Sequence, residues 1–393
     1  MFKKKSLIIL YLFYEYLADG VGGLGHIWEV SKNLERQGHT VVIFAPRCGE
    51  YKVEESLKIK YVPTINVRFF RFISFHFLLL FYLGYYLIHN KVDVLYVREM
   101  ALSLTPLMLV KIFKKPMITE INGDLLTEYK FAGYPQLFLA AVRTVEMLVL
   151  RMSQAVVCVT EGLRDVFRIR YNLSSEKMYV IPNGTDTDHF HPLDRSACRQ
   201  NLRIDSKIKV VGFVGTFVPH QGLSYLIKSS SLILKKAPDV TFLLVGDGPL
   251  RKDLVDMIQH VGLMDYFLFT GAVPRDKVVL YINAMDVCVA PFTRKRNERI
   301  GLSPLKIYDY LACGKPVVAS NIKGVGDLLQ QNEIGIAIRP EDPASLARGV
   351  LRALEDHDLT ARCLQGGPAI VKKNFTWQIT AQKVAEVCSE TVG

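Results

Sequence analysis

Short apolar runs alternate along the whole chain with segments in which apolar residues recur every three or four positions. A strand buried on both faces reads as a continuous apolar run, whereas a helix that covers a sheet has one apolar face. The alternation therefore predicts βα units and a parallel sheet. The helical period is clearest at 27–36 and 137–152. We expect an α/β protein.

Apolar runs bounded by turn residues mark the expected strands. In the first half of the chain they are 7–13, 40–44, 92–97, 117–121, 155–160 and 178–181. In the second half they are 209–214, 241–245, 267–269, 287–290, 316–320 and 336–338. Between 186 and 206 no period is visible and Pro192 interrupts the chain, which is typical of a linker.

The length of 393 residues exceeds what one hydrophobic core usually serves. We expect a first domain at 1–190 and a second at 200–372. Two doubly wound sheets that face each other across a cleft are the simplest architecture. In such sheets ligands bind at the carboxyl ends of the strands, so the loops that follow the strands are where chemistry is expected.

Composition and charge narrow the class of protein. The seven cysteines are scattered and form no C-x-x-C pair, which argues against a disulfide framework and a zinc site and favours a reducing cytoplasm. The net charge of +11 favours a phosphate-bearing ligand or an anionic membrane surface. Nucleic acid is the weakest partner, because no zinc-finger spacing, RNA-binding strand motif or long basic run is present.

Two apolar segments resemble membrane spans. Residues 1–19 begin with three lysines, but they lack a small-x-small cleavage site and contain Glu15, so we expect a first buried strand. Residues 72–88 are short for a span and contain Ser74 and Gly84, so we expect a buried or interfacial helix.

Arg68 and Arg71 stand among aromatic residues just before and within this second segment, at 69, 70, 72, 75 and 77. This pattern suits a helix that rests at the head-group boundary of an anionic membrane, on its inner face. It suits equally a helix whose aromatic residues are core and whose arginines only flank it. Both interpretations stand at this point.

Glycine-rich loops follow the first strand of each half. Residues 20–25 match G-x-G-x-x-G, but Ala45, Pro46 and Arg47 follow the next strand where a dinucleotide site needs an acidic residue. NAD is therefore disfavoured. Gly22 and Gly23 still let the backbone approach a ligand, and His26 lies near a helix start that favours an anion. The alternative is a tight turn without a ligand.

In the second half, Gly215 and Thr216 end a strand ahead of a helix, and Gly246 repeats this pattern one unit later. The segment that follows Pro291 carries the most chemistry. We expect Arg294, Lys295, Arg296 and Arg299 in a loop, then Ser303 as N-cap, Pro304 at the first helical position, and Lys306 and Asp309 on one helix face. A lysine at a helix N-terminus suits a diphosphate, and a carboxylate one turn on suits ribose hydroxyls. The alternative is an ordinary surface ion pair.

At this point the sequence resembles the family 4 glycosyltransferases over nearly its whole length. The resemblance rests on Gly22 to His26 with Gly38, His39 and Val41, on the V-I-P-N-G run at 180–184, on the S-P-L-K…A-C-G-K-P-V-V-A-S block at 303–320, and on Phe375 with Trp377. It implies the GT-B fold, a retaining reaction without a metal ion, and a last helix at 376–393 that packs back on the first domain.

The resemblance also implies roles for individual residues. Lys306 and Arg299 would stabilise the leaving diphosphate, with His26 and Asn122 as the other catalytic residues. The donor, with UDP or GDP as its nucleotide, would be bound by Gly22, Gly23, Gly215, Thr216, Gln221, Gly246, Gly271, Val273, Arg294, Ser303, Pro304, Leu305 and Asp309. No cofactor or metal is expected.

Three positions depart from the family pattern. Thr216 and Gln221 stand where many members have arginine and lysine, Gly301 stands at the first of two paired glutamates, and Asn122 stands at a common histidine. We expect a glycosyltransferase that acts on a glycan, a lipid-linked or a small-molecule acceptor. A nucleotide-sugar epimerase on the same fold and a binding protein of reduced activity are the alternatives.

Overall fold

The computed structural model divides into two units. Unit 1 comprises Met1–Pro182 and Trp377–Gly393, and unit 2 comprises Asn183–Thr376. The structure describes residues 6–14, 22–47, 57–65 and 67–393. Unit 2 begins at Asn183, so the stretch at 186–206, expected as a linker, belongs to it and contains the helix α7 (Arg195–Leu202). The last helix, α16 (Trp377–Val392), belongs to unit 1.

Unit 1 is built on a seven-stranded sheet with the order β3-β2-β1-β4-β5-β6-β7. Every pair in it is parallel, and β1 pairs with β2 on one side and with β4 on the other. The strands are β1 (Ile8–Leu12), β2 (Thr40–Arg47), β3 (Lys58–Pro63), β4 (Val94–Arg98), β5 (Met117–Ile121), β6 (Ala155–Cys158) and β7 (Met178–Val180).

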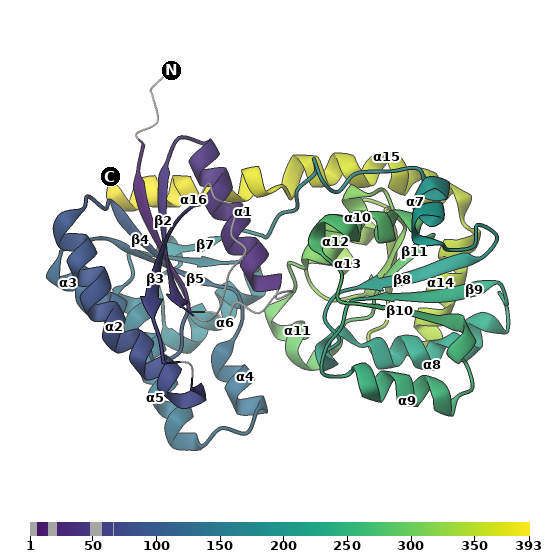
Figure 1. Ribbon diagram of the computed structural model, residues 1–393, viewed down its shortest axis with the longest axis horizontal. Coiled ribbons are helices and arrows are strands. Elements are labelled where there is room, and N and C mark those ends of the chain that lie inside the picture. The colour runs from purple at the N-terminus through teal and green to yellow at the C-terminus, as the bar shows by residue number, and fades with distance from the viewer. Residues whose placement is uncertain (1–5, 15–21, 48–56, 66) are drawn as a thin grey trace. The chain divides into compact units, whose positions relative to one another are not determined.

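Helices cover this sheet, and α16, the last helix of the chain, packs along α1 (Figure 1). The helix α2 contacts both β3 and α3. The helices of unit 1 before α16 are α1 (Gly22–Arg36), α2 (Arg68–His89), α3 (Thr105–Ile112), α4 (Leu125–Phe131), α5 (Gln136–Met152) and α6 (Glu161–Tyr171), and the 3₁₀ turn is η1 (Ser175–Lys177).

Unit 2 is built on a six-stranded parallel sheet with the order β10-β9-β8-β11-β12-β13. The central strands are buried on both faces, as their unbroken apolar runs predict. The strands are β8 (Lys209–Val214), β9 (Val240–Val245), β10 (Phe267–Gly271), β11 (Val287–Ala290), β12 (Val317–Ser320) and β13 (Gly335–Ile338).

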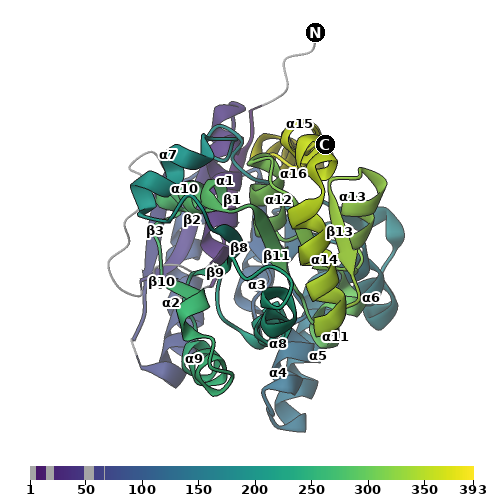
Figure 2. The same ribbon diagram turned by 90° about the vertical axis from the view of Figure 1, so that its right-hand side faces the viewer.

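Helices pack on both faces of the second sheet. Figure 1 shows α10, α12 and α15 above the strands and α8 and α9 below them, and Figure 2 shows α14 alongside β13. Besides α7, they are α8 (Leu223–Leu234), α9 (Arg251–His260), α10 (Arg275–Ala284), α11 (Arg294–Ile300), α12 (Leu305–Ala312), α13 (Gly326–Gln331), α14 (Pro343–Glu355) and α15 (His357–Asn374), with the 3₁₀ turns η2 (Pro219–Gln221) and η3 (Met264–Tyr266).

The expected α/β class with two doubly wound sheets is confirmed, and each expected run contains a strand. The sequence interpretation missed β3, an edge strand whose lysines at 58 and 60 are exposed. Strand order reverses between β1 and β4 in unit 1, and between β8 and β11 in unit 2. Ligands of such sheets bind at the carboxyl ends of the strands beside this reversal.

Candidate functional site

Lys306 is the centre of the candidate site in unit 2. It lies in the first turn of α12, and its Nζ donates a hydrogen bond of 2.7 Å to Oε1 of Gln221 in η2. The same Nζ lies 3.7 Å from the centre of the Phe213 ring and 5.7 Å from that of Phe292. Loss of hydration in this setting moves the pKa of Lys306 well below its usual range, although Asp309 acts in the opposite direction.

Two glycines let the groups around this lysine pack closely. A Cβ at Gly215, which follows β8 with φ 140°, would lie 2.7 Å from the Nζ of Lys306. A Cβ at Gly246, which follows β9, would lie 2.2 Å from the carbonyl oxygen of Gly215. Side chains are therefore excluded where the two strands end, because Lys306 and the Gly215 carbonyl occupy the space that a Cβ would need.

Arg296 and Lys306 are the positive groups around His220, which is itself neutral at pH 7. Burial, together with the charges of Arg296 and Lys306, lowers the pKa of His220 to about 4. The backbone of His220 also accepts hydrogen bonds from the Thr293 N–H at 3.1 Å and from the Asn297 side chain at 3.3 Å. Two cations that help to suppress the charge of a neighbouring histidine in this way favour an anion beside them. Sequence reasoning missed His220, whose only signal was its place in the turn after β8.

The start of α12 differs from the prediction. The helix begins at Leu305 with Pro304 as its N-cap residue, so Ser303 does not cap it. Ser303 instead accepts a 2.8 Å hydrogen bond from the Asn183 N–H, and the Asn183 side chain donates to the Ser303 carbonyl at 2.8 Å. The cap prediction failed because the hydroxyl has this partner more than a hundred residues away, which no local pattern reveals.

Asp309, in the second turn of α12, is buried and not open to solvent. Its Oδ1 accepts a hydrogen bond from the hydroxyl of Thr185. Burial raises the pKa of Asp309, and the positive charge of Arg275 together with the Thr185 hydrogen bond offsets part of that effect. Thr185 is a further residue that sequence reasoning did not select.

The remaining predicted donor residues surround this centre less closely. Arg294 and Arg299 are exposed on α11, which corrects the expectation that this basic segment is a loop. The Arg294 N–H donates to Glu341 at 3.0 Å. Thr216 is exposed, and Val273 is partly buried after β10. Gly271 has φ 71°, and its carbonyl accepts the Gly246 N–H at 3.0 Å.

A second polar cluster lies in unit 1 at the carboxyl end of β5. Glu120 is buried there, with Oε1 2.9 Å from Nε2 of His26 and Oε2 accepting a 2.9 Å hydrogen bond from the Tyr11 hydroxyl. The side chain of Asn122 also donates to Oε1 of Glu120. Burial alone would raise the pKa of Glu120, but His26, Arg98 and Asn122 together bring it far below the usual range.

Two of the predicted catalytic residues, His26 and Asn122, therefore contact the same carboxylate, that of Glu120. The His26 ring also meets Trp377 of α16 edge to face, with ring centres 5.4 Å apart. Sequence reasoning missed Glu120, although its place two residues before Asn122 at the end of a strand could have indicated it. Gly22 and Gly23 are the first residues of α1, and the loop before them lies outside the described residues.

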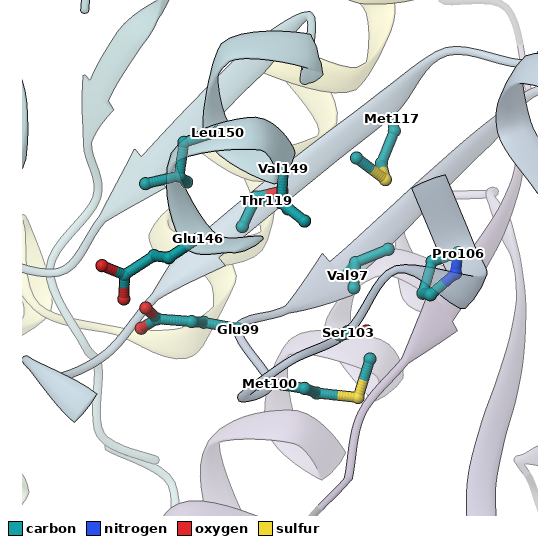
Figure 3. Close-up of a pocket in the computed structure, with 10 residues that line it drawn as sticks. All are labelled: Val97, Glu99, Met100, Ser103, Pro106, Met117, Thr119, Glu146, Val149 and Leu150. Atoms are coloured by element: carbon teal, nitrogen blue, oxygen red, sulfur yellow. The ribbon is translucent and has the colours of Figure 1, made fainter. Parts of the chain in front are cut away.

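A pair of buried carboxyl groups closes one end of a small cavity in unit 1 (Figure 3). Glu99, just after β4, and Glu146 of α5 point toward each other there. Burial raises the pKa of both groups, and for Glu99 the neighbouring Glu146 adds to the effect. Glu146 also accepts a hydrogen bond from the Tyr171 hydroxyl. The two carboxyl groups therefore keep their protons to higher pH than free carboxyl groups do.

Metal-binding groups are absent from the described part of the chain: no three His, Cys, Asp or Glu side chains there could hold one ion. The arrangement in unit 2 suits an anionic group held by the Lys306 and Arg296 cations. The arrangement in unit 1 suits a histidine oriented by a carboxylate.

Comparison with known proteins gives the same two-part division. A model described as "Glycosyltransferase Family 4" matches residues 21–189, and one described as "Glycosyl transferases group 1" matches residues 194–369. The chain is 24% identical over 295 residues to an alpha-D-kanosaminyltransferase of Streptomyces kanamyceticus, with 74% of each chain covered. It is 28% identical over 218 residues to a 2-deoxystreptamine glucosyltransferase of the same organism, of which the match spans 55%.

Among solved structures, HepE of Anabaena in complex with UDP superposes with a TM-score of 0.78 at 21% identity. The match covers 98% of this chain and 100% of that protein. The same protein has also been solved with UDP-glucose. At this identity the likeness shows the fold.

Proposed function

The chain belongs to the family 4 type of glycosyltransferases, with the GT-B fold, and we propose that it moves a hexosyl group from a nucleoside diphosphate sugar to a glycan, a lipid-linked or a small-molecule acceptor. The transfer retains the configuration at the anomeric carbon and uses no metal ion. One observation carries the donor assignment: the Lys306 ammonium stands beside Gly215, and together with the Arg296 cation it helps to suppress the charge of His220.

A diphosphate is the ligand that this cluster favours. Burial without an anion depresses the pKa of Lys306, and a bound diphosphate reverses that effect because it supplies the missing opposite charge. The first turn of α12 adds the positive end of its dipole. The UDP and UDP-glucose complexes of HepE, a protein of the same fold, support UDP as the nucleotide, with GDP as the other choice.

The barrier to transfer without a covalent intermediate lies in separating the anomeric carbon from a diphosphate that gains negative charge. Fixed cations stabilise that charge without having to reorganise. Lys306 is the principal group, with His220 and Arg296 close by and Arg294 and Arg299 at the rim. The backbone at 271–273 meets the base, and Asp309, whose carboxylate is bonded to Thr185 in this structure, exchanges that hydrogen bond for the ribose hydroxyls.

Gln221 and Thr216 replace the basic residues that many members of this family have at these positions. In this chain Gln221 accepts the hydrogen bond of Lys306 and so orients the ammonium group. Lys306 therefore carries the charge stabilisation that several basic residues share in those family members. The residues found here at 216 and 221 are compatible with turnover. In unit 1, His26 and Asn122 receive the acceptor hydroxyl, and Glu120 orients the imidazole.

A donor screen tests this function. The purified chain is incubated with UDP- and GDP-linked hexoses and a panel of acceptors, with and without EDTA, and products are identified by mass spectrometry. We expect nucleoside diphosphate release together with glycosylated acceptor for one nucleotide, at the same rate in EDTA. Donor binding without release would instead identify a binding protein, and an altered sugar on the nucleotide would identify an epimerase. Rescue of an EDTA-treated sample by magnesium or manganese would exclude the metal-free mechanism.

A further inference from the structure

The helix α2 is apolar on two opposite faces. One face packs into the core through Phe75, Leu79, Leu83 and Leu87, which are at most 6% exposed. The other face carries a second stripe at the same four-residue spacing, Ile73, Phe77, Phe81 and Tyr85, with exposed fractions of 48%, 62%, 57% and 66%. A helix at the surface of a soluble protein normally has a polar outer face. This one has exposed rings in contact, with Phe77 and Phe81 edge to face at 5.2 Å.

Apolar exposure continues beyond α2. The neighbouring helix α3 exposes Met108 and Ile112, and Phe70 and Ile88 are exposed near the two ends of α2. Exposed apolar patches of this extent mark interaction surfaces. We call the exposed apolar residues of α2 and α3 the α2–α3 face.

Basic residues surround this face, and acidic ones are missing from the sequence around it. Between Glu55 and Asp93 the chain contains no Asp or Glu. Lys58 and Lys60 are exposed on the adjacent edge strand β3. Lys91 is exposed just after α2, and Lys111 and Lys114 are exposed at the end of α3. A partner for the α2–α3 face must therefore offer apolar material with negative charge around it.

We propose that the α2–α3 face docks on a lipid bilayer that contains anionic head groups. Rings on the outer stripe of α2 enter the head-group boundary while the lysines of β3 and α3 meet lipid phosphates. Segment Phe70–His89 is long and apolar enough to cross a membrane. The stripe at Phe75 to Leu87 nevertheless holds it against the sheet, so the helix lies along the membrane surface instead of crossing it.

This geometry divides the aromatic residues between the two sequence interpretations of the segment, because Phe75 belongs to the core and Phe77 to the surface. The side chains of Arg68 and Phe69, and Lys3 to Lys5, lie outside the described residues. A second copy of the chain is a poorer occupant than a bilayer, because two identical faces would bring their lysines together.

Docking depends on no step of the transfer reaction, so it is measured with the full-length protein alone. The protein is sedimented with vesicles of phosphatidylcholine, or of phosphatidylcholine with 30% phosphatidylglycerol, at low and high salt. We expect binding to the anionic vesicles that weakens with salt. Phe77→Ser with Phe81→Ser lowers the partition coefficient about tenfold or more, and Lys111→Glu with Lys114→Glu lowers it by about fivefold per lysine.

Matched controls lie in unit 2. Leu364→Ser replaces an exposed leucine, and Lys235→Glu with Lys236→Glu reverses two exposed lysines, and neither change should alter binding. Circular dichroism and thermal melting confirm that each variant is folded. Protein that stays in the supernatant with anionic vesicles at low salt overturns the proposal. It is also overturned if the protein resists extraction by alkaline carbonate, or if light scattering shows a dimer that Phe77→Ser with Phe81→Ser dissociates.

Discussion

Lys306 combines a short hydrogen bond to Gln221 with a ring contact to Phe213, so its ammonium has exchanged much of its water for fixed neighbours. A cation in that state contributes most when negative charge develops beside it. We predict that Lys306→Ala lowers kcat by about two decades or more and leaves the melting temperature nearly unchanged. Steady-state kinetics with the identified donor measures this, with Lys235→Ala just after α8 as the control. An unchanged kcat would place the charge-stabilising role elsewhere.

Glu120 meets Nε2 of His26 at 2.9 Å, so in the proposed reaction it acts through that histidine. We predict that Glu120→Gln, which keeps the size of the side chain but removes its charge, lowers kcat by roughly tenfold or more. The Michaelis constant for the donor, which binds in unit 2, should stay the same. Exposed Glu176→Gln is the control. A variant with a lower melting temperature but normal kcat would show that Glu120 only stabilises the fold.

At the scale of elements, the periodic pattern was sufficient for most of the fold. Strands that are buried on both faces, such as β8 and β11, read as continuous apolar runs, and their bounds were predicted at 209–214 and 287–290 as found. The edge strand β3 has exposed lysines, and α11 has a basic sequence without an apolar period, so neither gave that signal.

The candidate site was predictable only in part. Lys306, Gly215 and Gly246 belong to local strand and helix signatures, so their place at the carboxyl edge of the sheet follows from the pattern. The partners Thr185, His220 and Glu120 reach their sites through tertiary contacts, as in the hydrogen bond from Thr185 to Asp309. Which hydroxyl or carboxylate meets which cation is set by packing, and a single sequence does not contain that information in any local spacing.

The carboxyl pair between β4 and α5 makes the stability of unit 1 depend on pH. The pKa of Glu99 is raised on folding by burial and by Glu146, so the folded state keeps its proton to higher pH than the unfolded state does. The stabilising effect is complete below the ordinary value of 4.5 and is lost as pH rises above it. The neighbouring ion pair of Arg170 with Asp124 has the opposite dependence, because Arg170 and Thr127 outweigh burial and lower the pKa of Asp124.

We predict that Glu99→Gln removes the loss of stability that unit 1 shows as pH rises above 4.5. The difference in the free energy of unfolding between variant and wild type should grow in favour of the variant above pH 4.5, with a slope of at most about 1.4 kcal/mol per pH unit. Urea denaturation at a series of pH values measures the difference, in which the other titrating groups cancel. Parallel curves for the two proteins would show that the carboxyl groups do not share a proton in the folded state.

At the scale of the whole molecule, the chain leaves unit 1 at Pro182 and returns to it at Trp377. Unit 1 is therefore complete only with its last helix, where Trp377 is buried and meets His26. Unit 2 is one continuous stretch of chain and carries the cluster around Lys306 that we propose for the donor. The two units should thus respond to different perturbations, even though one chain links them twice.

We predict two separable effects on thermal unfolding. A nucleoside diphosphate at a hundredfold excess over its Kd should stabilise unit 2 by about 2.7 kcal/mol, because it binds the folded cluster around Lys306 and not the unfolded chain. Trp377→Ala should destabilise unit 1 by about 3 kcal/mol or more, because it opens a large cavity under α16. Calorimetry combined with proteolysis assigns each transition to its unit, with the fragments identified by mass spectrometry. Adding the nucleotide to the Trp377→Ala variant should move only the transition of unit 2. If the nucleotide raises the transition of unit 1 by as much, the donor cannot be held by the unit 2 cluster alone.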